Sequence, residues 1–148
     1  MLFGLCEGNF CEQNDARGKK KGNGRVHVFR KHKGTWMDDH RILPIPPTAD
    51  FKDYSDIAIR AEHGKKKVSV AITSQEAKSV WIGKIDLTKP SFVGKGKVHR
   101  FPKKSFCNVE GVDWVSAKKL VCVSDKAKSD QPNKCKKKEM SIHLMKIK

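Results

Sequence analysis

Five carboxylates stand at the ends of apolar runs, where side chains from different runs can reach a common point. Glu7, Glu76 and Asp125 follow such runs, whereas Asp56 and Glu110 stand at the start of two others. Clustered carboxylates repel one another and favour a hard cation such as calcium, whose ligands are oxygens. The same groups could instead accept hydrogen bonds from backbone N–H groups of the adjoining loops. The pattern therefore predicts either a calcium site or a set of structural acceptors.

Basic side chains occupy the loops that follow three of these carboxylates. The candidate anion-binding residues are Lys19, Lys20, Lys21, Lys78, Lys126 and Lys128. A basic rim beside a cation-filled centre would suit a phosphorylated ligand, because metal and lysines would share its charge. Charge runs are also typical of solvated loops, so that alternative stays open. A further run, residues 65–67, is expected on the opposite face, which weakens the case for one focused patch.

The five cysteines include no C-x-x-C pair and no Cys/His cluster at zinc spacing, which argues against a structural metal site. Cys6 and Cys122 lie inside apolar runs and are expected to be buried free thiols. Cys107 and Cys135 lie in loops of one repeat and form a possible disulfide.

The elements that position these groups are short strands. Helical periodicity is almost absent, and β-branched and aromatic runs recur between turn residues, which predicts an all-β fold. The predicted strands are residues 2–7, 25–30, 41–45, 54–60, 68–74, 80–87, 97–101, 109–115, 120–124 and 141–147.

These runs repeat as a unit of about four strands, as in the blades of a β-propeller. We expect one domain over 1–148 with three blade-like repeats, a partial one at 2–47 and others at 54–101 and 108–148. In such blades the five carboxylates and most of the basic loops would emerge on one face near the axis. Propellers close with four to eight blades. The chain is therefore expected to be a fragment, to pair with other chains, or to form an incomplete ring; a β-sandwich or an open barrel is the alternative.

One segment carries a family resemblance. Asn108-Val109-Glu110-Gly111, followed by a strand that ends in Ser124-Asp125, resembles a blade of the phytase-like and esterase-like propeller proteins. The likeness is strongest over 53–148. Because that group includes calcium-dependent phosphate-ester hydrolases, the resemblance implies an acidic metal site with calcium as the cofactor.

Charge and hydropathy limit the partners. Lys and Arg number 32 against 16 Asp and Glu, a formal charge of +16, which favours polyanions. Aromatic residues make up 7%, and no RNA-binding signature is present, so nucleic acid is possible without support from a motif. No apolar stretch is long enough to span a membrane, and the first ten residues lack the pattern of a secretory signal. The compartment stays open, and we expect that sequence upstream of Met1 has been lost.

Three functions follow in order of preference. The first is a binding module for an anionic ligand or a protein partner. The second is a calcium-dependent hydrolase of phosphate or other esters, with the carboxylates at 56, 76, 110 and 125 as ligands. The third is a basic RNA-associated accessory protein. No G-x-S-x-G motif is present, and the sequence identifies no catalytic residue.

Overall fold

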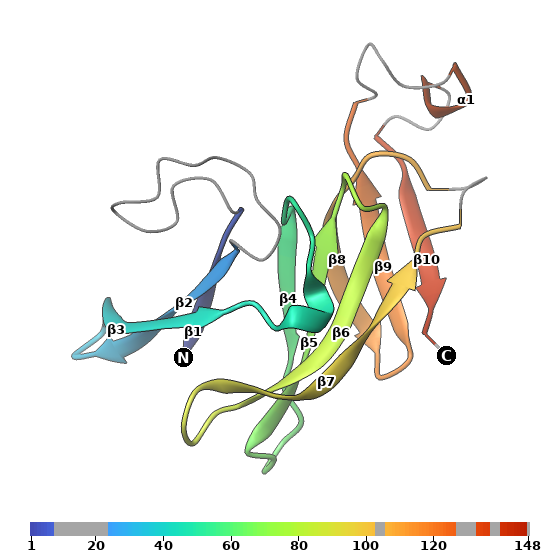
Figure 1. Cartoon of the computed structure of the whole chain (residues 1–148). Helices are drawn as coiled ribbons and strands as arrows, with labels where there is room; N and C mark the ends of the chain where they lie inside the picture. The colour runs from blue at the N-terminus through green and yellow to red at the C-terminus, as the bar shows by residue number, and fades with distance from the viewer. Residues whose placement is uncertain (8–23, 103–105, 127–132, 137–139, 148) are drawn as a thin grey trace.

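The computed structural model describes residues 1–7, 24–102, 106–126, 133–136 and 140–147, and these form three antiparallel sheets (Figure 1). The first sheet contains β1 (Leu2–Cys6), β2 (Arg25–His32) and β3 (Thr35–Pro44). The middle sheet contains β4 (Asp56–Arg60), β5 (Lys67–Ser74), β6 (Ser79–Asp86) and β7 (Ser91–Arg100). The third sheet contains β8 (Val109–Ser116), β9 (Lys119–Ser124) and β10 (Ile142–Lys146). Each strand pairs with its neighbour in sequence, and no sheet closes into a barrel, so the all-β prediction is confirmed.

Helices contribute little to this part of the chain. A 3-10 turn, η1 (Pro47–Ala49), links β3 to the middle sheet, and α1 (Asn133–Lys136) is a single turn before β10. Within the described residues, no helix has the length and apolar character needed to cross a bilayer.

The middle sheet is buried on both faces. Val68, Val70 and Ile72 of β5 belong to the core shared with the first sheet. Ala71 of the same strand and Val80 of β6 belong to the core shared with the third sheet. Because side chains alternate between the two faces of a strand, the consecutive buried residues Val70, Ala71 and Ile72 place apolar side chains on both faces. The three sheets therefore form a stack of three layers.

The outer sheets bury one face each. In β9, Leu120 and Cys122 point into the core, whereas Val123, the residue after Cys122, is exposed. In β2, Val26 and Val28 are fully buried against the middle sheet. This alternation with a period of two leaves a second face on each outer sheet that no described element covers.

Trp81 fixes η1 against the middle sheet. Its ring is fully buried, and its Nε1 donates to Thr48 Oγ1 at 3.0 Å. A Cβ atom at Gly83 or Gly96 would collide with the indole, and Gly96 also has a φ of +63°. Both positions therefore require glycine, one for space and one for space and backbone conformation.

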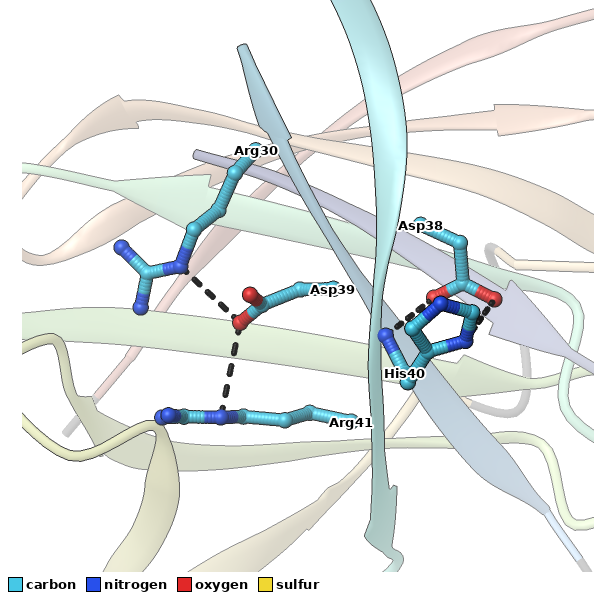
Figure 2. Close-up of polar contacts among 5 residues, drawn as sticks. All are labelled: Arg30, Asp38, Asp39, His40 and Arg41. Atoms are coloured by element: carbon cyan, nitrogen blue, oxygen red, sulfur yellow. Dashed lines mark hydrogen bonds and ion pairs between the residues drawn. The ribbon is translucent and has the colours of Figure 1, made fainter. Parts of the chain in front are cut away.

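The outer part of β3 is held by charged residues. The Asp39 carboxylate lies 2.9 Å from Arg30 Nε and 3.4 Å from Arg41 Nε, while Asp38 accepts a hydrogen bond from the backbone N–H of His40 (Figure 2). The β2–β3 register shifts here, and His40 has a φ of +54°. These contacts stabilise a β-bulge in β3, a strand that begins six residues earlier than predicted.

Candidate anion-binding site

The predicted calcium ligand Asp56 has a different role in the structure. Its Oδ1 accepts from the N–H of Ile57 at 2.8 Å, and its Oδ2 accepts from the N–H of Val112 at 2.7 Å. Val112 belongs to β8, so this carboxylate joins the middle sheet to the third sheet. Asp56 is therefore a structural acceptor, which is one of the two roles that the sequence left open.

Glu76 lies near a carboxylate that the sequence analysis missed. Buried Asp53 accepts from Ser74 Oγ at 2.5 Å and from the N–H of Glu76 at 3.1 Å. The Glu76 side chain itself is 53% exposed and lies 3.7 Å from Lys52 Nζ. Asp53 precedes β4 in a loop, and nothing in its spacing distinguishes it from a solvated residue.

The remaining predicted ligands are Glu7, Glu110 and Asp125. Glu7 is exposed just beyond β1, Glu110 is partly buried in β8, and Asp125 is exposed after β9 with its N–H donating to Asn108 O at 3.0 Å. All five predicted ligands are described, and nowhere in the described part of the chain do three or more His, Cys, Asp or Glu residues gather to hold a metal ion. The five carboxylates form no such group among the described residues, and the calcium site and the hydrolase function stay predictions.

The predicted basic rim is only partly visible. Lys78 is exposed in the turn between β5 and β6, and Lys126 is exposed after β9, where its carbonyl accepts from Asn108 Nδ2 at 2.8 Å. The other four predicted lysines, Lys19, Lys20, Lys21 and Lys128, lie outside the described residues. Neither Lys78 nor Lys126 lines the cleft described next.

A basic cleft lies at the opposite end of the middle sheet, and we call it the Arg60 cleft. Its volume is about 480 Å³. Its lining consists of five cationic side chains, one carboxylate and one hydroxyl: Arg60, Lys65, Lys66, Lys67, Lys84, Glu62 and Ser69. Like charges in one cleft raise its electrostatic potential and attract anions.

The strand register builds the cleft. Arg60 of β4 pairs with Ser69 of β5, and Ser69 pairs with Lys84 of β6, so the three form one row across neighbouring strands. Lys67 lies on the same face as Ser69, two residues earlier in β5, because side chains alternate. Lys65 and Lys66 come from the turn between β4 and β5. Residues distant in the sequence therefore converge, which no linear motif could have indicated.

Arg60 is the most constrained cation in this cleft. Its Nη2 lies 2.7 Å from Glu62 Oε1, and its Cζ lies 5.5 Å from the centroid of the Trp114 ring. Its Nε is buried and is the one buried side-chain donor or acceptor in the described residues that lacks a hydrogen-bond partner. An unsatisfied buried donor costs about 1–3 kcal/mol of stability.

A second cavity of about 430 Å³ adjoins the Arg60 cleft, and Ser69 and Lys84 line both. It extends between the middle and third sheets past Lys97, His99 and Trp114, and no Asp or Glu lines it. Burial, with a contribution from the charge of Lys97, holds the pKa of His99 below its usual value. The basic surface thus continues from the Arg60 cleft along β6 and β7.

One other polar cluster could suggest chemistry. Ser124 Oγ and Ser141 Oγ lie 3.0 and 2.9 Å from His143 Nε2, and the Phe106 ring stacks on the imidazole with centroids 4.5 Å apart. Ser124 is buried, which keeps its hydroxyl away from a substrate. The cluster ties β9 to the start of β10.

The cysteines follow the sequence in part. Cys107 and Cys135 are joined by a disulfide with Cα atoms 5.5 Å apart. Cys122 is a buried free thiol, and burial raises its pKa to about 12. Cys6 is disulfide-bonded, so the prediction of a free thiol there is wrong. The apolar run around Cys6 indicates only burial and gives no signal of a disulfide.

Comparison with known proteins adds no assignment. No protein-family model, curated protein or solved structure matches the chain. The resemblance to phytase-like and esterase-like propellers therefore stays a prediction, and function must be argued from the Arg60 cleft itself.

Proposed function

We propose that the chain is a binding module for an anionic ligand, with the Arg60 cleft as its site. The observation that carries the proposal is the convergence of five cationic side chains on one cleft that holds a single carboxylate. A buried guanidinium Nε without a partner lies among them.

The chemistry of the lining favours an oxyanion such as a phosphate. Arg60 presents a planar set of donors that suits paired oxygens, and the lysine ammonium groups add charge without fixed geometry. Glu62 holds one edge of the guanidinium through Nη2 and orients the rest of it. A bound oxyanion would lower the mutual repulsion of the lysines in the cleft.

The two alternative functions have less support. The hydrolase requires converging carboxylates, yet Asp56 is occupied by two backbone donors and Glu76 lies beside Lys52. The RNA-associated function would benefit from aromatic faces open to bases beside the cations, but the exposed Trp36 on β3 does not line the Arg60 cleft. Both stay predictions, and anion binding is the function that the geometry supports best.

The test is calorimetric titration with inorganic tripolyphosphate, a compact polyanion that does not depend on a particular metabolite. Lys67→Ala combined with Lys84→Ala removes two cleft charges. Lys78→Ala combined with Lys126→Ala is the matched control, because it removes the same charge from exposed lysines outside the Arg60 cleft. We expect the cleft variant to bind at least about tenfold more weakly, equivalent to about 1.4 kcal/mol, and the control to lose far less.

Two results would overturn the proposal. Equal weakening by both double variants would mean that binding follows the overall charge of +16 and not the Arg60 cleft. Failure of the unmodified protein to bind tripolyphosphate at low salt, where surface charges are least screened, would remove the site altogether.

We also propose that the three sheets are propeller-type blades. Each is a meander of neighbouring strands, and the first strand of the middle sheet lies against the first strand of the third through the bond from Val112 N–H to Asp56. The Nε1 of Trp114 in β8 likewise donates to Ala58 O of β4, at 3.2 Å. Adjacent first strands are what a ring of blades around an axis requires.

A further inference from the structure

The outer face of the third sheet carries an exposed apolar patch. Ile142 and Leu144 of β10 are 73% and 64% exposed, and Val123 of β9 is 44% exposed. Ile142 pairs with Val123, and Leu144 pairs with partly buried Val121, so the four side chains form two adjacent rungs. Contiguous exposed apolar surface of this kind marks an interaction site more often than chance.

The same rungs are covered where they occur in the middle sheet. β5 and β9 can be aligned by their last residues, Ser74 and Ser124. In this alignment, Thr73 occupies the position of Val123, and Ala71 occupies the position of Val121. Thr73 pairs with Val80, and Ala71 pairs with Ile82, which places these two on the positions of Ile142 and Leu144. Ala71 and Val80 are fully buried in the core shared with the third sheet, and Ile82 is partly buried against it; Thr73 is fully buried as well. The exposed patch therefore repeats a face that this chain already uses to bind another sheet.

The first sheet exposes the complementary face. Val26 and Val28 point toward the middle sheet, so His27 between them points away from it. Ile42 pairs with His27 and therefore lies on the same outer face. Leu2, opposite Phe29, lies on the same outer face, and Leu2 and Ile42 are 48% and 45% exposed. Each sheet has one face that points toward the sheet after it in the sequence and one that points toward the sheet before it. Within the chain, the first kind of face packs against the second kind, between the first and middle sheets and between the middle and third sheets. The outer faces of the third and first sheets are the two that lack this match in the described structure.

We infer that a second copy of this chain docks head to tail, the outer face of its first sheet covering the Val123–Ile142–Leu144 patch. A second copy is the expected occupant because the two uncovered faces are of opposite kinds. The uncovered face of the third sheet points forward and that of the first sheet points backward, which is the combination that already packs within the chain. Contacts of this heterologous type form a closed ring when the rotation between copies closes. Two copies would bring together six sheets, a number within the range of closed propellers.

The experiment measures the molar mass of the full chain in solution by sedimentation equilibrium. We expect a dimer, with about twice the 16.7 kDa of one chain. Leu144→Lys and Ile42→Lys each place a charge on one of the two faces at an exposed position, so each variant should fold and be monomeric. Val98→Lys is the control, because Val98 is an exposed apolar residue of β7 that lies on neither outer face. Circular dichroism checks that all three variants keep their strand content.

Mixing the two variants distinguishes the proposed contact from others. A chain with Leu144→Lys keeps an intact first sheet, and a chain with Ile42→Lys keeps an intact third sheet, so an equimolar mixture should recover dimers through one restored interface. A monomeric unmodified protein would overturn the inference. A dimer that Leu144→Lys breaks and Ile42→Lys leaves intact would also overturn it, because the patch would then pair with itself.

Discussion

The two ends of the middle sheet use charge in opposite ways. At the end marked by the turn between β5 and β6, Asp53 and Asp56 accept bonds from serine and backbone donors. At the other end, the Arg60 cleft gathers five cations around one carboxylate. A satisfied buried carboxylate stabilises the fold, whereas cations that outnumber the carboxylates of a cleft attract an anion. We call these the carboxylate end and the lysine end.

The comparison shows why counts of charged residues mislead about sites. The acidic residues are half as numerous as the basic ones, yet they supply specific structural bonds at defined positions. The larger basic set includes exposed residues such as Lys78 and Lys126 that line no part of the Arg60 cleft. The anion-binding site proposed for the lysine end depends on which cations the strand register places side by side.

The largest effect is expected from the disulfide near the carboxylate end. Asn108, next to Cys107, accepts at Oδ1 from Gln75 Nε2, so the bridge anchors the loop that contacts the end of β5. Replacing Cys107 and Cys135 by serine releases a loop of 28 residues, for which chain entropy predicts a loss of about 3.5 kcal/mol. Urea unfolding followed by circular dichroism measures this loss. A change below about 1 kcal/mol would mean that the bridge does not constrain the carboxylate end.

Asp53→Ala is expected to have the next largest effect. It leaves Ser74 Oγ and the N–H of Glu76 without their acceptor, at a cost of about 2–3 kcal/mol in the free energy of unfolding. Glu76→Ala is the control: it removes an exposed ion pair with Lys52 and should cost less than about 1 kcal/mol. Repeating both measurements with calcium tests the competing role. Stabilisation by calcium that either substitution abolishes would show that the carboxylate end binds metal.

Substitutions at the lysine end should show the opposite sign. Lys66→Ala combined with Lys67→Ala removes two like charges from the cleft. We expect the free energy of unfolding at low salt, measured by thermal unfolding, to stay constant or rise by up to about 0.5 kcal/mol. Salt should erase the difference, because the repulsion is screened. A clear loss of stability in these variants would mean that the lysines support the fold, and the contrast between the two ends would fail.

The smallest effect concerns His99, which lines the cavity adjoining the Arg60 cleft. Its pKa is lowered in the folded protein by burial and by Lys97, so the unfolded chain takes up the proton first as the pH falls. The native state should lose stability as the pH drops through the usual histidine pKa of about 6.5 towards the lower folded value. His99→Gln should flatten this part of the stability curve, measured by thermal unfolding between about pH 7.5 and 5. An unchanged curve would place His99 in a solvated environment.

The strands were largely predictable from the sequence because apolar and β-branched runs coincide with burial. All ten predicted runs overlap observed strands, and the apolar residues of β5, Val68 and 70–72, belong to the sheet that is buried on both faces. β3 and β7 begin at Thr35 and Ser91, six residues earlier than predicted at both places. The first halves of these two strands are rich in Asp, Lys and Gly, which are uncommon in strands, so the sequence pattern does not predict them. Backbone pairing with β2 and β6 nevertheless makes these residues part of the strands.

The site was less predictable than the strands. The expectation that residues 65–67 lie on the side opposite to the carboxylates matches the structure, but the run by itself resembles a solvated loop. Its partners, Arg60, Ser69 and Lys84, come from three strands and join it only through the pairing register. Asp53 was missed because its burial depends on contacts with β5 that no local pattern encodes.

The position of Trp114 against Arg60 gives the protein an optical reporter of its own. Trp81 is fully buried and Trp36 is 46% exposed on β3, whereas Trp114 lines the cavity beside the Arg60 cleft. Iodide, a small anionic quencher, should accumulate near the cationic lining and dim the fluorescence of Trp114 more than acrylamide, which carries no charge. A ligand that fills the cleft would then protect one emission component from iodide. Occupancy could thus be followed in the unlabelled protein.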